Sequence, residues 1–334
     1  MTVFCLTEVE DGVVADVSLR ALTLARGLPG ALAAVVFASP PLVPPLVPPS
    51  VLADLAAHGV SDVYAVSGTG GYAPQAWARA LADLASGASG PVVILAAGTD
   101  RGNEVLAHVG AITGLPMAAN CVAVSAVDAA PGGDADSAAC EIVRQRWAGL
   151  LLEEAVLEAP VALLTVGTDA VSARPAGEPG PAIVHPVTPS LAVGDLAVRA
   201  AETPAGAGGA SLASARVVVG GGRGVGSADG FAPLDELASL LGGVVGVSRV
   251  VTSEGWRPHT QQVGQTGTKI TPDVYLACGI SGAIQHIAGC SGAKHIIAIN
   301  TDPAAPILGR ADYAIIGDLH EVIPALIKAL RDRT

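Results

Sequence analysis

Short runs rich in valine and isoleucine alternate with longer segments of helical period along most of this chain. Runs such as residues 92–96 and 161–166 carry no charged side chain, which predicts strands buried on both faces. Segments such as 16–26 and 231–241 repeat apolar residues at three- and four-residue spacing, which predicts helices packed on a sheet along one stripe. The alternation therefore predicts an α/β fold with mostly parallel sheets flanked by helices.

This pattern is interrupted once, by a stretch of glycine, alanine and proline without an apolar face. It predicts a linker over 201–213 between an N-terminal α/β domain, 1–200, and a C-terminal Rossmann-like domain, 214–334. The N-terminal domain is expected to contain strands at 3–7, 33–38, 60–66, 92–96 and 161–166 and helices at 16–26, 51–58, 75–85 and 104–113. The C-terminal domain is expected to contain strands at 216–219, 244–247, 274–278, 295–299 and 313–316 and helices at 231–241 and 319–330.

Composition argues against several classes of function. The chain of 334 residues carries 30 acidic and 18 basic side chains, a net charge of -12, whereas nucleic acid binding needs clustered lysine and arginine. No apolar run approaches the ~20 residues of a membrane-spanning helix, so no membrane insertion is expected. Five scattered cysteines without a C-x-x-C pair predict no disulfide framework and fit a reducing cytoplasm. The histidines show no metal-ligand spacing, so no metal site is expected.

Unusual polar residues follow each of the five strands expected in the C-terminal domain. They are the glycine-rich segment 220–229, Ser248 with Arg249, the segment 279–286, Asn300 and Asp318. The carboxyl ends of parallel strands share one edge, and open α/β sheets bind ligands there. The sequence therefore predicts a ligand site at this edge.

Two regions of this domain, the glycine-rich segment 220–229 and the loop 261–268, have both a functional and a plain structural interpretation. The glycine run does not fit G-x-G-x-x-G, because Val225 or Ser227 occupies the last position. It either brings Arg223 and backbone N–H groups to a diphosphate or forms an ordinary turn. The loop 261–268 offers amide and hydroxyl groups to the edge of a heteroaromatic ring, or it is a neutral surface loop.

The segment 279–286 is predicted to lead into a helix. Ser281 is expected to cap that helix, whose first turns carry Gln285 and His286. A lone histidine is more often structural than functional. We find no nucleophile elbow, phosphate-binding P-loop or catalytic dyad, so no catalytic residue is expected and a bound redox cofactor would supply the chemistry.

The segments 222–224, 247–249, 262–267, 279–286 and 298–303 resemble the alpha subunit of electron transfer flavoproteins. Their order and spacing match over 216–330, whereas the first half resembles the family in length, in its βα pattern and around 143–149. The resemblance implies a heterodimer with a beta subunit and one FAD. The cofactor-binding residues that it implies are Arg223, Ser248, Arg249, Gln262, Val263, Gly264, Gln265, Thr266, Ser281, Gly282, Ala283, Ile284, Gln285, His286, Asn300, Asp318 and Leu319.

The resemblance also implies a role for several of these residues. Arg223 and Ser248 would contact the diphosphate and ribityl region, and Arg249 would lie against the isoalloxazine ring. Gln265 and Thr266 would meet the flavin edge around N5 and O4. The alternative for Arg249 is a surface arginine paired with a neighbouring glutamate, Glu254 in this sequence.

The remaining implied contacts come from the later strands. Residues 281–285 would line the diphosphate and ribityl chain, and His286 would face the O2 side of the flavin. Asn300 and Asp318 would hold the adenosine end. The sequence departs from the family pattern at Ser253, where an acid is common, and at 257–260.

The function that the resemblance implies is that of an electron carrier without substrate turnover of its own. Such a subunit accepts electrons from flavin dehydrogenases, for example the acyl-CoA dehydrogenases of fatty acid beta-oxidation, and passes them to a membrane quinone oxidoreductase. One alternative is an NAD(P)-dependent Rossmann oxidoreductase, which the failed glycine fingerprint disfavours. A second alternative is a non-redox scaffold subunit that has lost FAD, which the intact polar segments disfavour.

Overall fold

The computed structural model describes residues 1–10, 12–37, 47–127, 137–147, 149, 151–177, 180–200, 212 and 215–332. The chain divides into two compact units, Met1–Thr203 and Pro204–Thr334, each an α/β structure with helices beside a largely parallel sheet. This confirms the expected fold class. The expected linker 201–213 lies, except for residue 212, outside the described residues, so the finer limits 1–200 and 214–334 stay a prediction.

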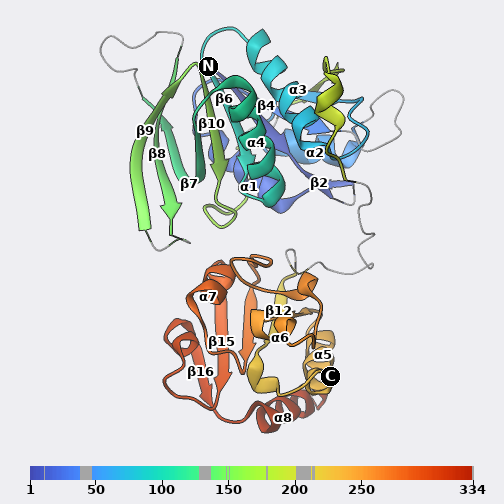
Figure 1. Cartoon of the computed structure of the whole chain (residues 1–334), viewed down its shortest axis with the longest axis vertical. Coiled ribbons are helices and arrows are strands. Elements are labelled where there is room, and N and C mark those ends of the chain that lie inside the picture. The colour runs from blue at the N-terminus through green and yellow to red at the C-terminus, as the bar shows by residue number, and fades with distance from the viewer. Residues whose placement is uncertain are drawn as a thin grey trace. The chain divides into compact units, whose positions relative to one another are not determined.

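The N-terminal unit contains a nine-stranded sheet in the order β11-β5-β4-β1-β6-β10-β7-β8-β9 (Figure 1). Its pairs are parallel from β11 to β7, and β8 pairs antiparallel with both β7 and β9. A separate short antiparallel pair joins β2 (Val9–Glu10) to β3 (Val13–Val14). The strands of the large sheet are β1 (Thr2–Thr7), β4 (Ala31–Phe37), β5 (Asp62–Val66), β6 (Val92–Ala97), β7 (Met117–Ala126), β8 (Ala138–Arg146), β9 (Leu151–Ala159), β10 (Val161–Val166) and β11 (Ile183–Val187).

Helices cover both faces of the parallel part of this sheet. Alternate residues of β1 show the arrangement, since Val3 and Cys5 belong to the core cluster of α1 (Asp16–Ala25) and α2 (Pro49–Ala57). Phe4 and Leu6 belong instead to the cluster of α3 (Pro74–Gly87) and α4 (Asp100–Thr113). A short 3₁₀ helix, Val193–Leu196, follows β11.

The antiparallel strands β7, β8 and β9 were not among the predicted elements. In β9 exposed and partly buried residues alternate, and Leu152 and Val156 are exposed beside Glu154 and Glu158. Such half-exposed strands lack the uninterrupted apolar run that marks a strand buried on both faces. The sequence rule used for the parallel strands therefore missed them.

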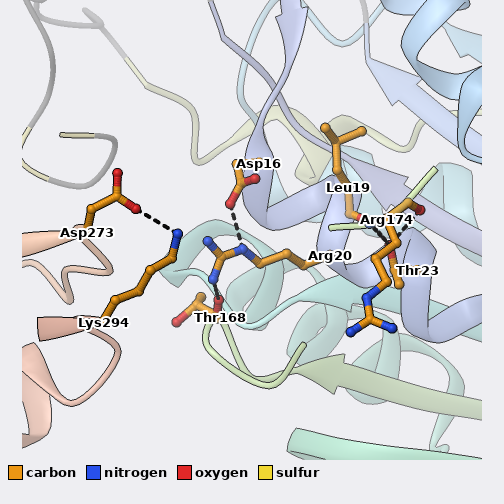
Figure 2. Close-up of polar contacts among 8 residues, drawn as sticks. All are labelled: Asp16, Leu19, Arg20, Thr23, Thr168, Arg174, Asp273 and Lys294. Carbon is orange, nitrogen blue, oxygen red and sulfur yellow. Dashed lines mark hydrogen bonds and ion pairs between the residues drawn. The ribbon is translucent and has the colours of Figure 1, made fainter. Parts of the chain in front are cut away.

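Helix α1 is anchored to a segment far along the chain (Figure 2). Arg20 Nη1 donates to the Thr168 carbonyl oxygen at 3.0 Å, and its Nε also bonds Asp16 one turn earlier. The backbone N–H of Arg174 donates to Thr23 Oγ1 at 3.0 Å. These bonds tie the helix to the chain that leaves β10, which closes this side of the unit.

The C-terminal unit contains a five-stranded, fully parallel sheet in the order β13-β12-β14-β15-β16. The predicted strands of this domain are confirmed within two residues at each end. The strands are β12 (Val217–Gly221), β13 (Val244–Val247), β14 (Val274–Cys278), β15 (His295–Asn300) and β16 (Tyr313–Ile316). The helices are α5 (Ala232–Leu240), α6 (Arg249–Ser253), α7 (Ile284–Cys290) and α8 (Leu319–Arg331), with 3₁₀ turns η2 (Arg223–Val225), η3 (Asp229–Phe231), η4 (His259–Gln261) and η5 (Pro306–Arg310).

Two core clusters fill the two faces of this sheet. Val219 of β12 packs with α5 and α8, whereas its neighbour Val218 packs with α7, η5 and the loop that contains Val263. The side-chain alternation of a strand thus gives each face its own helices.

Ion pairs occupy the amino edge of the same sheet. Lys294 Nζ donates to Asp273 Oδ1 at 2.6 Å (Figure 2), and Arg216 Nε donates to Asp273 Oδ2 at 2.7 Å. Both hydrogen bonds lower the pKa of the Asp273 carboxyl, the one from Lys294 most. These three residues directly precede β14, β15 and β12, so the charges at this edge are already paired with one another.

Among the described residues, no helix is long and apolar enough to cross a membrane. All five cysteines are buried free thiols. Burial raises the pKa of Cys5 and of Cys278 to about 12, so both stay protonated at neutral pH.

The central strands should dominate the stability of the N-terminal unit. Replacing Leu95, fully buried in β6, by alanine is expected to lower the free energy of unfolding by about 2–5 kcal/mol, because a cavity replaces packed methyl groups. Leu152→Ala is the matched control, since Leu152 is 68% exposed, and it should change stability by less than about 0.5 kcal/mol. Urea unfolding followed by circular dichroism measures both, and equal losses would contradict the assignment of this core.

Candidate functional site

The carboxyl edge of the five-stranded sheet collects the polar segments that the sequence singled out. The strands are all parallel, so the segments that follow β12, β13, β14, β15 and β16 leave from the same edge. They are η2 with Arg223, α6 with Arg249, the approach to α7, the turn at Asn300 and the start of α8. The expected gathering of these segments at one edge is confirmed.

A cavity of about 300 Å³ lies at the β13 end of this edge, lined by Arg249, Thr252, Ser253, His259, Gln262 and Thr266. Its walls come from α6, η4 and the residues 261–268, which we call the glutamine loop. Three of these lining residues, Arg249, Gln262 and Thr266, were predicted site residues. Thr252 was missed, although its position one turn after Ser248 on a helix that starts at a strand end was a usable signal.

Hydrogen bonds fix the polar groups of this cavity. Gln262 is only 2% exposed, and its Oε1 accepts from Thr252 Oγ1 at 2.8 Å. Its Nε2 donates to Thr266 Oγ1 at 3.1 Å. Because Thr266 accepts from the amide, its own hydroxyl proton remains available for a ligand. The buried glutamine therefore orients an exposed donor rather than serving as the donor itself.

The backbone of the glutamine loop is held on two sides. Val263 N–H donates to the Val247 carbonyl oxygen at 2.9 Å, and Gln265 N–H donates to the Gln285 carbonyl oxygen at 2.8 Å. Gly289 of α7 lies against Gly264. A Cβ added at Gly289 would come within 2.3 Å of the Gly264 Cα. The loop is thus pinned between β13 and α7, and it presents Gln265 and Thr266 to solvent.

Arg223 and Arg249 are exposed, and neither forms an ion pair with any residue that the structure describes. The alternative in which Arg249 pairs with Glu254 therefore finds no support there. Arg257 differs, since its Nη2 donates to Asp235 Oδ2 at 2.5 Å and its guanidinium lies 4.8 Å from the Phe231 ring centroid. Arg257 is a packing residue, whereas Arg223 and Arg249 keep all their donors for an anionic or π-electron ligand.

His286 lies inside the protein, 6% exposed, at the start of α7. Its Nε2 is 2.7 Å from the hydroxyl oxygen of Tyr275, while its buried Nδ1 has no hydrogen-bond partner in the described part of the chain. Burial lowers the pKa of His286 to about 4, opposed weakly by the nearby Val263 backbone. The imidazole is therefore neutral at pH 7.

The approach to α7 corrects one prediction. The N-cap residue of α7 is Ala283, which has no capping side chain, so Ser281 does not cap this helix. The Ser281 carbonyl oxygen instead accepts from Ile307 N–H at 3.1 Å, Gly282 has a φ of 85°, and Ala283 is extended (φ −54°, ψ 148°), so the helix begins only at Ile284. Ser281, Ala283, Ile284 and Gln285 are exposed, and Gly282 is buried against Ile307.

The far end of the edge carries Asn300, Asp318 and Leu319. Asn300 Nδ2 donates to the Ile280 carbonyl oxygen at 2.8 Å, and its Oδ1 accepts from Asp302 N–H at 3.0 Å. Asp318 caps α8 by accepting from His320 N–H at 2.8 Å, with its second carboxylate oxygen exposed to a ligand. The Leu319 side chain is buried in the core, so only its backbone could serve a ligand. None of these three lines the cavity beside α6, and their ligand contacts stay predictions.

This arrangement defines a class of protein. Exposed arginines and the Thr266 hydroxyl stand along the carboxyl edge of a parallel sheet, and the described residues contain no cluster suited to a metal ion. Such an edge suits an elongated anionic cofactor with a planar ring, as in dinucleotide-binding α/β domains.

Comparison with known proteins specifies the class further. Residues 3–190 match the model of the electron transfer flavoprotein domain, and residues 211–291 match the electron transfer flavoprotein FAD-binding domain. The chain is 35% identical over 334 residues to electron transfer flavoprotein subunit alpha of Mycobacterium leprae (strain TN), a match that covers 98% of each chain. It is 36% identical over 337 residues to the subunit of the same name in Mycobacterium tuberculosis (strain H37Rv), over 99% of this chain and 98% of the relative.

A local match is stronger. The chain is 54% identical over 121 residues to electron transfer flavoprotein subunit alpha of Thermoanaerobacterium thermosaccharolyticum, which covers 36% of this chain and 37% of that relative. The chain thus matches little more than a third of the length of this relative, and nearly the full length of the mycobacterial ones. This chain belongs to the electron transfer flavoprotein alpha subunit family, and FAD is the cofactor of its C-terminal domain.

The residues of the edge fit FAD. Within the part of the chain that the structure describes, Arg223 and Arg249 are unpaired and suit a diphosphate and an electron-rich ring, the Thr266 hydroxyl is free to donate, and the buried Nδ1 of His286 lacks a partner.

The buried state of His286 should make stability depend on pH. Its folded pKa is about 4, below the ~6.5 of an unfolded chain, so the unfolded chain binds the proton first as pH falls. We expect the free energy of unfolding to decrease from about pH 6.5 toward pH 4, by on the order of 3 kcal/mol from this residue. His286→Gln should flatten that part of the curve, whereas His320→Gln, at an exposed position, should not.

The measurement is urea unfolding at a series of pH values, followed by fluorescence of Trp256 in a background where Trp77 and Trp147 are phenylalanine. Trp256 then reports the C-terminal unit alone. An unchanged pH dependence in His286→Gln would show that the histidine is not held neutral by burial.

Proposed function

We propose that this chain, with a beta subunit, forms a cytoplasmic heterodimer that holds one FAD and carries electrons. Its donors are flavin dehydrogenases such as acyl-CoA dehydrogenases, and its acceptor is a membrane quinone oxidoreductase. The observation that carries the proposal is that the FAD-binding match over 211–291 contains the cavity formed by α6 and the glutamine loop. The similarity to the mycobacterial alpha subunits, 35% and 36% identical over nearly the full length, supports it. The free, buried cysteines support the cytoplasmic location.

Within this proposal the chain's own residues bind and orient the cofactor. Arg223 and Ser248, with residues 281–285, take the diphosphate and ribityl chain, and Asn300 and Asp318 take the adenosine end. Val263, Gly264 and Leu319 contribute backbone only, because their side chains are absent or buried. The domain limits 1–200, 201–213 and 214–334 belong to the same proposal.

The ring end is assigned to the cavity beside α6. Thr266, polarised by Gln262, donates toward the flavin edge together with Gln265, and Arg249 lies against the ring. FAD supplies the electron chemistry, since its ring system stores and releases electrons singly or in pairs. The positive charge of Arg249 favours any negative charge on the ring more than it favours the neutral ring. The protein turns over no substrate of its own in this role.

Co-expression with a candidate beta subunit tests the proposal. We expect the purified pair to show a flavin absorbance spectrum and the mass of a heterodimer, and FAD to raise its melting temperature through ligand linkage. The chain alone should hold FAD weakly. A colourless pair would support a scaffold that has lost FAD, binding of NAD(P) without flavin would support a dehydrogenase, and tight FAD in a strict monomer would contradict the shared site.

Arg249 gives the sharpest prediction for the ring end. Arg249→Ala should retain FAD but lower the midpoint potential for uptake of the first electron by on the order of 50 mV, because a fixed positive charge is lost. Arg249→Lys keeps the charge but loses the planar guanidinium group. Its midpoint potential should therefore lie between those of Arg249→Ala and the unmodified protein. Spectroelectrochemical titration of the heterodimer measures the potential.

The matched control is Arg331→Ala. Arg331 is exposed, pairs with Glu236 and lies at the end of α8 away from the cofactor edge. It should leave the potential unchanged. Equal potentials in Arg249→Ala and the unmodified protein would remove Arg249 from the ring site.

A further inference from the structure

Tyr275 is the second residue of β14, the middle strand of the C-terminal sheet, and none of its surface is exposed. Space for its hydroxyl is provided by Gly220 of the neighbouring strand, where an added Cβ would come within 2.3 Å of the Tyr275 hydroxyl oxygen. Tyr275 therefore cannot touch a ligand at the carboxyl edge. Its hydroxyl has one polar partner among the described residues, Nε2 of His286 at 2.7 Å.

The two possible proton arrangements of this pair differ in what they leave unsatisfied. If Nε2 carries the ring proton, the tyrosine O–H and the Nδ1 lone pair are both buried without partners. If Nδ1 carries it, the tyrosine donates to Nε2, and the Nδ1–H is the single donor without a partner. A buried donor or acceptor without a partner destabilises the fold, so the second arrangement, which leaves one such group instead of two, is favoured.

One further observation agrees with a proton on Nδ1. Burial raises the pKa of Tyr275 well above its usual value, so the hydroxyl keeps its proton and can donate. The remaining neighbours with ionisable groups are the thiols of Cys278 and Cys290, which burial keeps protonated.

We propose that Tyr275 is a positioning residue that holds His286 in its Nδ1–H tautomer and so keeps that N–H as a donor for an acceptor atom of the bound cofactor. The proposal rests on the proposed function for the cofactor, whereas the tautomer itself is a property of the chain alone. The hydroxyl fixes both the ring orientation and the nitrogen that carries the proton. The acceptor would be a ring oxygen or nitrogen, because these carry lone pairs in the plane that an N–H can meet.

Nuclear magnetic resonance of the full chain with ¹⁵N-labelled histidine tests the tautomer. The His286 signals are identified by their loss in His286→Gln. We expect the Nδ1 resonance of a protonated nitrogen and the Nε2 resonance of an acceptor, and in Tyr275→Phe a decrease in the Nδ1–H fraction. Tyr313→Phe is the matched control, because Tyr313 is 67% exposed in β16 and forms no hydrogen bond to His286.

Each outcome decides a part of the proposal. A protonated Nε2 in the unmodified chain would overturn it without any variant, and an unchanged Nδ1–H fraction in Tyr275→Phe would remove the role of Tyr275. With the beta subunit and FAD added, the Nδ1–H proton signal should shift, and Tyr275→Phe should raise the FAD dissociation constant about fivefold, as for one lost hydrogen bond. A signal that does not move on FAD binding would overturn the donor role.

The failure of the proposed function gives a different result. If no flavin binds to any heterodimer, including that of Tyr313→Phe, the cofactor assignment fails. The tautomer of His286 is still tested, because it is measured on the chain alone.

Discussion

The site depends on the parallel pairing of five strands in the C-terminal unit. Because every strand runs the same way, Arg223, Arg249, Asn300 and Asp318, which are far apart in sequence, all follow strand ends at one edge. The opposite edge is occupied by ion pairs around Asp273. The sheet thus separates paired charges from unpaired ones, and the unpaired arginines remain for an anionic cofactor in a chain of net charge -12.

Around that edge, close backbone packing positions the ring end of the site. Gly289 of α7 meets Gly264, and Val263 bonds β13, so the glutamine loop can present Gln265 and Thr266 only in one direction. Beneath it, His286 and Tyr275 form a buried polar pair. In the proposed arrangement, a change at Tyr275 in β14 would act on the cofactor through His286 of α7 without touching the cofactor itself.

The sequence predicted most of the C-terminal unit because its strands are uninterrupted apolar runs whose ends are marked by polar residues. It did not predict β7, β8 and β9. In β9, for example, more than half of the side chains are exposed and include leucines and glutamates, so the strand lacks an uninterrupted apolar run. The sequence predicted a helix cap at Ser281 because serine is a common N-cap residue, but the Ser281 backbone bonds Ile307, and the N-cap residue is Ala283 with the helix beginning at Ile284. Local preference there was overridden by a tertiary contact.

The sequence by itself determined the α/β class, the edge at which polar residues gather, and the resemblance to a flavoprotein subunit. These follow from period, strand ends and motif order, which are local in the chain. Only the tertiary structure decided that Gln262 is buried and serves Thr266, and that Tyr275 meets His286 across the packing of β14 and α7. Hydrogen-bond partners depend on which side chains burial brings within about 3 Å of each other. A pattern along the chain does not give the distance between side chains that are far apart in sequence.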